Sequence, residues 1–360
     1  MQRRELLAGA VGLAALGSSL GRASLAAAEP RPKIKVAQIG VRHSHAAGKL
    51  EAIRRLSDDY EVVAIAERDA KAREAAAKSE PYLGLNWATE DDVLARDDVQ
   101  AVVVETHWND ATAVALRAIE AGKHIHLDKP GGVDHAAFRA MRQRAEERGL
   151  IVQMGYMLRY NPAFELLFQA QREGWFGEIL EVDASMGKLA PPGSRRELND
   201  YPGHGMFELA CHVVDAVVTL LGKPEKVSSF AKRSRAPQDD FPDVQLAVLE
   251  YPKALATIRC NHADPNGGPR RKFEVAGSAG RFEISPLESG RGTLSLSKKC
   301  GDYAAGTHTI QLPVPKGRYD GEFIDLARCI RGESTFRWNA AHDVALHATA
   351  QRAAGLAVAE

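Results

Sequence analysis

Residues 33–45 read KIKVAQIGVRHSH, and this stretch decides the fold class. Its apolar first part, up to Ile39, predicts a short buried strand that Gly40 ends. The alanine-rich segment over 46–56 then predicts a helix. A buried strand that runs through a glycine turn into a helix is the repeating unit of a parallel α/β sheet.

The same alternation continues to about residue 153. Apolar runs predict further strands, and helices are expected between them, with Thr89 and Asp92 as a capping box and Asp134 as an N-cap. The predicted strands cover 61–66, 101–105, 124–127 and 151–153, and the predicted helices cover 110–121 and 136–148. We therefore expect a doubly wound, Rossmann-type parallel sheet over 33–153, whose ligands bind at the carboxyl ends of the strands.

From residue 154 onward the pattern changes. Two predicted helices, 162–172 and 206–221, accompany β-type runs separated by turn residues, which predict an antiparallel sheet. These runs cover 179–186, 227–232, 244–251, 255–261, 272–275 and 281–284, and helical stretches near 322–331 and 340–356 close the chain. The expected fold is α/β then α+β. The second domain, 154–360, is an open antiparallel sheet for substrate binding and oligomerisation, with C-terminal helices able to pack back on the first domain.

The composition excludes several classes of protein. The 360 residues are 45% hydrophobic and 26% charged, so apolar burial can offset chain entropy and disorder over most of the chain is not expected. The 47 Lys and Arg residues balance 47 Asp and Glu residues, which argues against a nucleic-acid partner. The four cysteines are scattered and form no CxxC, which argues against a disulfide scaffold.

The N-terminal residues predict an export signal. Arg3-Arg4 precedes an uncharged run over 6–21, which is shorter than the roughly 20 residues of a membrane-spanning helix. Three alanines at 26–28 supply a small-residue cleavage site. A twin arginine ahead of a modest apolar stretch resembles a Tat signal. We expect residues 1–28 to be removed, leaving a periplasmic or otherwise exported protein with no stable membrane anchor. An uncleaved signal anchor is the alternative.

The ends of the first two strands carry candidates for nucleotide binding. A dinucleotide-binding fold usually places Gly-x-Gly-x-x-Gly after its first strand, where backbone amides approach a pyrophosphate. Here Gly40 is present, but Arg42 and His45 occupy the other two glycine positions. Glu67 stands where an acid accepts hydrogen bonds from the adenosine ribose, and Arg68 beside it could meet a 2′-phosphate, so NAD and NADP both stay open.

Two histidine pairs raise the question of a metal. His43-x-His45 and His124-x-His126 both lie by predicted strand ends, as in zinc hydrolases built on a β/α barrel. That barrel needs eight βα units, and the pattern supports only four or five. His124 and His126 also share one face of their strand, where they can simply pack. The sequence therefore predicts no metal.

The stretch AGKHIHLDKP over 121–130 contains the first catalytic candidate. Lys129 lies between Asp128 and a proline at the end of a predicted strand, so its ammonium is directed at the ligand crevice. There it can bind a substrate hydroxyl and stabilise developing oxyanion charge. Burial can also lower its pKa enough for proton transfer.

A second candidate group lies on the predicted helix 206–221. The spacings i, i+4 and i+7 place Glu208, His212 and Asp215 on one helix face. An acid beside a histidine orients the ring and sets its tautomer, as a general base requires. A salt-bridged structural helix explains the same pattern.

These motifs give the chain a resemblance to the Gfo/Idh/MocA family of oxidoreductases. GKH…DKP over 122–130 matches the family's AGKH…EKP segment, and 154–162 matches the stretch that opens its second domain. The E-x-x-x-H-x-x-D pattern over 208–215 is similar to its DxGxHxxD helix, and 273–280 also fits. The likeness covers residues 33–357.

The resemblance implies that Lys129 and His212 form an acid/base pair, with Glu208 as the acid four residues before the histidine. It also implies a nicotinamide cofactor, NAD or NADP, bound at the strand ends. The implied cofactor-binding residues are Gly40, Arg42, His43, Ser44, His45, Glu67, Arg68, Thr106, Asp128, Lys129 and Arg159.

The implied activity is hydride transfer between a sugar, polyol or related hydroxy compound and a tightly bound cofactor, in a homodimer or homotetramer. Two alternatives stay open: an NAD-dependent glycosidase or lyase that uses transient oxidation, and a non-catalytic sugar-binding homologue. The chain departs from the family pattern at 40–45, 106–109 and 200–205, so its crevice is lined differently. Export would require the cofactor to be loaded beforehand, because free NAD(P) is not expected in the periplasm.

Overall fold

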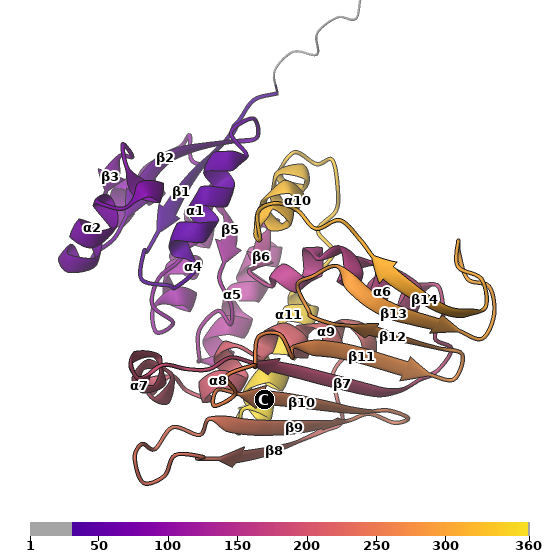
Figure 1. Cartoon of the computed structure of the whole chain (residues 1–360). Helices are drawn as coiled ribbons and strands as arrows, with labels where there is room; N and C mark the ends of the chain where they lie inside the picture. Colours follow the sequence, from indigo (N-terminus) through magenta and orange to yellow (C-terminus); the bar gives the residue numbers. More distant parts are fainter. Residues whose placement is uncertain (1–30, 359–360) are drawn as a thin grey trace, which may run out of the picture. The chain divides into compact units, whose positions relative to one another are not determined.

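The opening stretch forms a strand of a parallel sheet and the turn that follows it, as Figure 1 shows. The computed structural model describes residues 31–358. The predicted signal peptide, 1–28, lies outside the described residues. The described residues from Lys33 onward belong to one compact unit, so the predicted division at residue 154 stays a prediction. Within 31–358, no helix has the length and apolar content needed to cross a bilayer.

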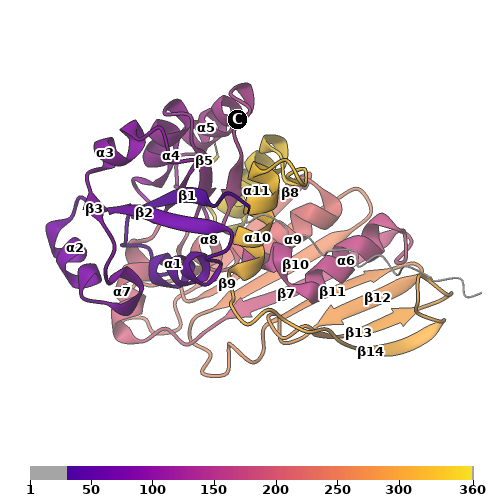
Figure 2. The same ribbon diagram turned by 90° about the horizontal axis from the view of Figure 1, so that it is seen from above.

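The first sheet has six parallel strands in the order β3-β2-β1-β4-β5-β6. Its strands are β1 (Ile34–Ile39), β2 (Tyr60–Ala66), β3 (Trp87–Ala88), β4 (Ala101–Val104), β5 (His124–Leu127) and β6 (Val152–Met154). The helices between them are α1 (Ala46–Arg55), α2 (Ala70–Ala77), α3 (Glu90–Ala95), α4 (Ala111–Glu120) and α5 (His135–Glu147), with a 3₁₀ turn, η1 (Glu80–Tyr82). Figure 2 shows α1 and α2 on one face of the sheet and α3, α4 and α5 on the other, which confirms the doubly wound prediction.

The second sheet has eight strands in the order β14-β13-β12-β11-β7-β10-β9-β8. The strands are β7 (Ile179–Gly187), β8 (Lys226–Lys232), β9 (Val244–Glu250), β10 (Leu255–Asn261), β11 (Lys272–Gly277), β12 (Gly280–Ile284), β13 (Arg291–Leu296) and β14 (Gly306–Gln311). All neighbours pair antiparallel except β7 and β10, which are parallel. The expected antiparallel sheet is thus mixed at one pair, and the last two strands were not predicted.

Helices from the second half of the chain lie against both sheets. They are η2 (Met157–Tyr160), α6 (Pro162–Arg172), α7 (Pro192–Asp200), α8 (His204–Glu208), α9 (Cys211–Leu221), α10 (Asp320–Ile330) and α11 (Ala340–Ala353). Helix α9 packs on β7 and β10, and α11 packs against α9 and α5 (Figure 1). Helix α10 contacts α1, so the C-terminal helices return to the first sheet.

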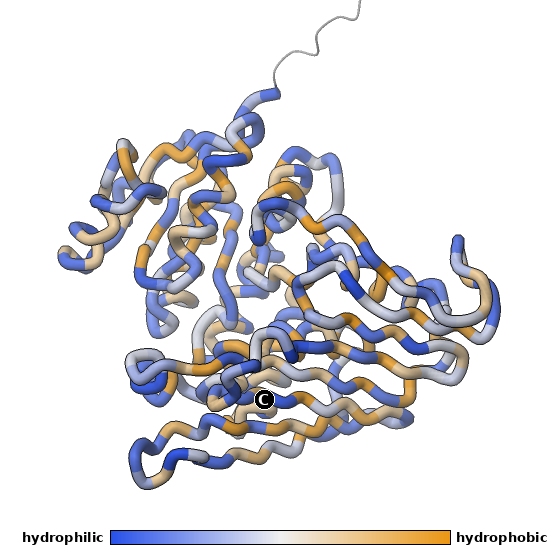
Figure 3. Tube along the Cα trace, viewed as in Figure 1, coloured by the Kyte–Doolittle hydropathy of each residue, from blue (hydrophilic) through white to orange (hydrophobic). Residues whose placement is uncertain are grey.

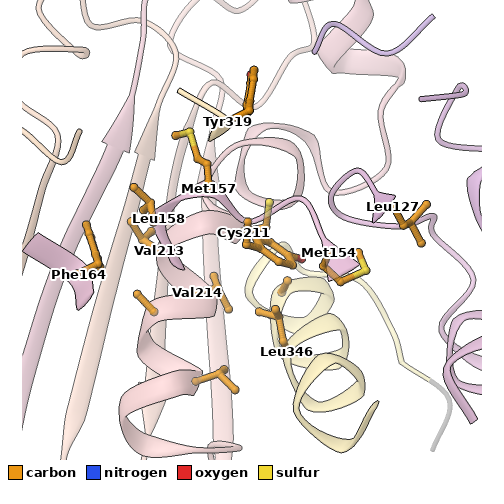
Figure 4. Close-up of a cluster of buried hydrophobic side chains, with 14 of the residues drawn as sticks. Leu127, Met154, Met157, Leu158, Phe164, Cys211, Val213, Val214, Tyr319 and Leu346 are labelled. Carbon is orange, nitrogen blue, oxygen red and sulfur yellow. The ribbon is translucent and has the colours of Figure 1, made fainter. Parts of the chain in front are cut away.

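Apolar residues occur along the strands of both sheets, as the hydropathy colouring of the chain trace in Figure 3 shows. All four residues of β4 are buried, as a strand covered on both faces requires. The close-up in Figure 4 shows side chains from the end of β5 together with others from η2, α9 and α11. One apolar core therefore continues from the first sheet into the helices that cover the second.

Local capping predictions are confirmed, but one helix prediction is wrong in its extent. Thr89 and Asp92 form both hydrogen bonds of a capping box, and Asp134 caps α5 by accepting from the Ala137 amide. The helix predicted over 206–221 is two helices, because the chain turns at Leu209 and the next amide bonds five residues back, to the Gly205 carbonyl. This break changes the relation between Glu208 and the histidine that follows it.

The central strands of the second sheet carry ion pairs on one face. Asp183 on β7 pairs with Lys272 on β11 at 2.9 Å and with Arg259 on β10, and Glu274 pairs with Arg281 on β12. Charged side chains remain solvated and need no apolar cover. The ion pairs on this face therefore give no reason to expect that a second copy of the chain covers it. The homodimer or homotetramer stays a prediction.

His347 joins α11 to the first sheet's helices and makes the fold sensitive to acid. Its ring stacks on Phe138 with centroids 4.3 Å apart and contacts Gly132 through Nε2 at 3.0 Å. Burial lowers the pKa of His347 to about 4, with a further lowering by His135 and opposition from the Gly132 contact and Asp134.

Folding thus favours the neutral form of His347. Its contribution to the free energy of unfolding is complete above about pH 6.5, the pKa of a histidine in the unfolded chain, and is lost as the pH falls towards 4. We expect the loss to reach about 2 kcal/mol at pH 5. His347→Phe should lose less free energy of unfolding between pH 7 and pH 5 than the parent, measured by urea denaturation. A control variant, His308→Phe on the edge strand β14, should behave as the parent. An equal loss in all three proteins would contradict the assignment.

Candidate active site

The site forms where three neighbouring strands end. Because β1, β4 and β5 are adjacent and parallel, their carboxyl ends bring together the segments that follow them, 40–45, 105–108 and 128–130. Gly40 has a φ of +94°, and a Cβ at this position would lie 2.5 Å from the Thr106 backbone nitrogen. Only glycine fits this close approach between the loops after β1 and β4.

Glu67 closes the end of β2 and holds the loop after β1. Its Oε2 accepts a hydrogen bond from the Val41 amide at 2.9 Å, and its Oε1 accepts from the Asp69 amide at 2.8 Å. Each carboxylate oxygen keeps a second lone pair, so Glu67 can still accept from a ribose hydroxyl. Arg68 points elsewhere, because its guanidinium lies 3.4 Å from Glu90 and 3.7 Å from Asp110.

A cavity of about 160 Å³ lies over the ends of β1 and β4. Five residues predicted from the sequence line it together: Arg42, His43, Ser44, Thr106 and Glu208. The remaining lining residues, His107, Trp108, Lys188, Ser194, Glu197, Leu198 and Tyr201, were not among the predicted site residues. Most of these come from α7 and its flanks, a polar helix whose sequence carries no apolar period that would have identified it.

Lys129 follows β5 and is bound to Glu208 at the edge of this cavity. Its ammonium donates to the Glu208 carbonyl at 2.7 Å and to the Glu208 carboxylate at 3.1 Å. The Lys129 side chain is almost fully buried, whereas Glu208 keeps part of its surface open to the cavity. The Glu208 carboxylate therefore faces the cavity, and the Lys129 ammonium lies behind it.

Burial and charge act in opposite directions on this pair. Burial alone would lower the pKa of Lys129, but the nearby carboxylates, Glu208 first among them, outweigh it and raise that pKa. Burial would raise the pKa of Glu208, and the ammonium of Lys129 more than reverses this. Both groups are therefore charged at neutral pH. The expectation that burial lowers the pKa of Lys129 is wrong, because the buried lysine has a carboxylate partner.

His212 lies at the start of α9, and Glu208 does not orient it. The break between α8 and α9 separates the two residues, and Glu208 bonds Lys129 instead. The His212 ring is 2% exposed and packs edge-on against Tyr156, with no hydrogen-bond partner on its Nδ1 in the described chain. Burial, with the charge of Lys129, lowers the pKa of His212 well below 6.5, so the imidazole is neutral.

Two residues placed near the site by sequence lie elsewhere. Asp215 does not face His212, because its carboxylate pairs with Arg159 at 2.7 Å and contacts His342 at 3.2 Å. Arg159 is fully buried and also pairs with Asp343 at 2.9 Å, between the rings of Tyr156 and Trp338. Within the described chain, the guanidinium of Arg159 is thus surrounded by two carboxylates and two aromatic rings, and it is not exposed towards the cavity.

His45 and Asp128 lie side by side beneath the loop after β1. The Asp128 carboxylate faces His45 Nδ1 at 3.0 Å and His43 Nδ1 at 3.1 Å, and its other oxygen accepts from the Lys129 amide at 2.6 Å. Burial lowers the pKa of His45 to about 4, against the opposing effect of Asp128. These residues form a largely buried group next to the cavity, which His43 also lines.

The residues present fit a nicotinamide dinucleotide at this edge. The strand order of the first sheet is the one found in dinucleotide-binding folds, with the binding crevice outside the carboxyl ends of the strands. Gly40 allows the tight turn, and Glu67 stands at the end of β2 with oxygens free to accept. Such a cofactor would be held by the loop after β1 and by Glu67.

Family models match both halves of the chain. Residues 34–156 match the oxidoreductase family with the NAD-binding Rossmann fold, and residues 164–283 match the GFO/IDH/MocA C-terminal domain. An uncharacterized oxidoreductase of Escherichia coli, YhhX, is 30% identical over 253 residues, which cover 69% of this chain and 70% of that protein. Trans-1,2-dihydrobenzene-1,2-diol dehydrogenase of Bos taurus is 29% identical over 197 residues, 54% of this chain and 57% of that enzyme.

Among solved structures, levoglucosan dehydrogenase in complex with NADH and levoglucosan has a similar fold. The TM-score is 0.75 at 18% identity, and the match covers 89% of this chain and 95% of that one. At this identity the likeness concerns the fold alone.

The position of Arg159 leads to a prediction that separates packing from cofactor binding. Arg159→Met should lower the free energy of unfolding by about 3–5 kcal/mol, because the buried Asp215 and Asp343 would lose the guanidinium that they share and keep only His342 and Arg142 beside them. Nucleotide affinity of the folded protein should stay unchanged. Chemical denaturation and fluorescence titration measure the two quantities, with the exposed Arg172→Met as control. Lost nucleotide affinity at unchanged stability would instead place Arg159 at the cofactor.

Proposed function

Because the chain belongs to the Gfo/Idh/MocA family of oxidoreductases and carries its NAD-binding Rossmann domain, we propose that it is a dehydrogenase of a sugar, polyol or related hydroxy compound. The dehydrogenase of trans-1,2-dihydrobenzene-1,2-diol, to which the chain is similar in sequence, supports a substrate with a hydroxyl-bearing ring. The cavity supports the same class, since Lys188, Glu197 and Glu208 offer polar groups to hydroxyls. The rings of Trp108 and Tyr201, 5.2 Å apart, offer an apolar surface.

The observation that carries the proposal is the Lys129–Glu208 pair at the end of β5. A charged ammonium held in a buried position by a carboxylate cannot turn away to solvent. Such a group is preorganised to stabilise negative charge that develops on a substrate oxygen. Glu208 adds a carboxylate on the cavity side, where it can accept a hydrogen bond from a second hydroxyl.

The proton and the hydride of the alcohol take separate routes in this proposal. A nicotinamide cofactor, held by the loop after β1 and by Glu67, would supply the hydride acceptor for the carbinol carbon. The charged Lys129, held against Glu208 on the cavity side, would stabilise negative charge that develops on the hydroxyl oxygen. The neutral His212, whose Nδ1 has no partner within residues 31–358, would accept the hydroxyl proton. In the reverse direction the same two groups return the proton to the carbonyl oxygen.

The test combines nucleotide content with one substitution. Protein purified from its native compartment should carry NAD(H) or NADP(H), detected by mass spectrometry and nicotinamide absorbance. Lys129→Met should lower the turnover of a responsive sugar or polyol by about 10²–10⁴-fold, the usual contribution of a proton-transfer or charge-stabilising group. Nucleotide binding should persist, because Glu67 and the loop after β1 are unchanged. The exposed Lys299→Met is the control.

Three other results would contradict the proposed function. Full activity in Lys129→Met would overturn the assigned role of the lysine. A protein that neither carries nor binds nucleotide would favour the sugar-binding homologue. Consumption of a glycoside without any net change in the nicotinamide would favour the glycosidase or lyase that recycles its own cofactor.

We further propose that residues 1–28 direct export through the twin-arginine route, on the strength of Arg3-Arg4, the short uncharged run and the alanine tract. Export of the folded chain would let it carry a loaded cofactor across the membrane. Replacing Arg3-Arg4 by two lysines should leave the protein in the cytoplasm, with residues 1–28 still present by N-terminal sequencing. Replacing Arg22 alone should leave export unchanged. Export at the parent's level in the twin-lysine variant would contradict the proposal.

A further inference from the structure

Beside the cavity, two imidazoles and two carboxylates converge from three strand ends. His43 and His45 come from the loop after β1, Glu105 follows β4 directly, and Asp128 follows β5 directly. Because these strands are neighbours in the sheet, segments far apart in the sequence meet at one point. The proposed dehydrogenase chemistry uses none of these four side chains.

The potential ligand atoms already lie at spacings that suit one small metal ion. Asp128 Oδ2 is 3.0 Å from His45 Nδ1 and 3.1 Å from His43 Nδ1. His43 Nδ1 is in turn 3.5 Å from Glu105 Oε2. A tetrahedral zinc ion with bonds of about 2.0–2.2 Å needs neighbouring ligand atoms roughly 3.3–3.5 Å apart. These three distances are within a few tenths of an ångström of that spacing, and the ligand atoms of His43, His45 and Asp128 all lie within 4.8 Å of one another.

Glu105 gives an independent reason to expect a ligand here. Its side chain is completely buried, and neither carboxylate oxygen has a hydrogen-bond partner within residues 31–358. A buried polar atom without a partner is costly, and such atoms are rare in folded proteins. The carboxylate faces the His43 imidazole, so a cation between them would provide the missing partner.

The charges around the group leave room for a divalent cation. Lys49 is the nearest fixed positive charge, 3.5 Å from Asp128, but it also lies 3.2 Å from Glu322. Lys49 is shared between Asp128 and Glu322, so the group has more acidic than basic side chains, and Glu105 would bind a metal ion as its carboxylate, with release of a proton. The Lys129 amide holds the other oxygen of Asp128 at 2.6 Å and so directs Oδ2 towards the imidazoles.

We propose that His43, His45 and Asp128, completed by Glu105, bind one divalent transition-metal ion of the zinc class. Two imidazole nitrogens and two carboxylate oxygens are a borderline donor set that suits Zn²⁺ or Co²⁺ better than Mg²⁺ or Ca²⁺, which prefer oxygen ligands alone. This proposal departs from the sequence-based expectation of no metal, which stays untested. The other predicted pair does not contribute: His126 bonds Lys49 and Gln153, and His124 bonds the Ile151 amide.

The ion would tie the loop after β1 to the ends of β4 and β5. That loop lacks two glycines of the usual nucleotide-binding pattern, and His45 occupies one of their positions. A metal clamp at His43 and His45 would hold the loop in one conformation beside the cavity, which His43 also lines. The site is thus a structural support for the cofactor-binding edge, separate from the proton-transfer groups.

Metal uptake tests the proposal without any turnover. The full chain, stripped with a chelator and dialysed, should bind one equivalent of Zn²⁺ by calorimetry and elemental analysis, with no comparable uptake of Mg²⁺. Co²⁺ should give visible absorption bands of a four-coordinate site. X-ray absorption of the zinc form should show nitrogen and oxygen ligands at about 2.0 Å.

Two variants make the assignment specific. His45→Ala should weaken Zn²⁺ binding by at least about 100-fold, because loss of a mere outer-shell partner already costs 10–100-fold. Glu105→Gln keeps the shape of the side chain and should also weaken Zn²⁺ binding. It replaces His45→Ala in the test if circular dichroism shows that His45→Ala does not fold. His308→Ala, a histidine on β14, is the matched control and should bind as the parent does.

The proposal is overturned if the parent takes up no Zn²⁺, if Mg²⁺ binds equally well, or if both site variants bind as tightly as the control. Nucleotide binding is measured on the same samples, so failure of the metal site and failure of the dehydrogenase assignment can be told apart. A metal-free protein that binds NAD(H) would leave the proposed function intact.

Discussion

The parallel pairing of β1, β4 and β5 is the constraint on which the candidate site depends. Parallel strands end at the same edge of a sheet, so the segments following these three strands meet regardless of the distance between them in the sequence. The close approach of Gly40 to the Thr106 backbone fixes the spacing of the first two segments. The cavity, the Lys129–Glu208 pair and the histidine–carboxylate group all lie at this edge.

Buried charges then join the two sheets. Lys129, which follows β5 of the first sheet, reaches Glu208 of α8, and Arg159 of η2 pairs with Asp215 and Asp343 on α9 and α11. Each of these charges would be expensive to bury alone, and each has an opposite charge within hydrogen-bond distance. The pairs therefore require the helices of the second half to lie where they do, because displacement would leave an uncompensated charge in the core.

Local sequence patterns predicted the elements well and the contacts of charged side chains less well. The strands of the first sheet and the capping box at Thr89 followed from short-range signals, since apolar runs and caps act within a few residues. The helix over 206–221 also satisfied an apolar period, yet its break at Leu209 placed Glu208 against Lys129 instead of His212. Spacing along an ideal helix cannot reveal a partner that arrives from another element.

The sequence by itself determined the fold class, the strand-end position of Lys129 and the likeness to an oxidoreductase family, because these depend on local periodicity and on motifs of neighbouring residues. Only the tertiary structure decided which charges meet. In the folded chain the pKa of Lys129 is raised, although the sequence suggested a lowered value. Arg159 and Asp215 form a buried ion pair, and Glu105 lies next to His43. The physical reason is that burial and Coulomb attraction depend on distances in space, and residues 43, 105 and 128 become neighbours only when the sheet forms.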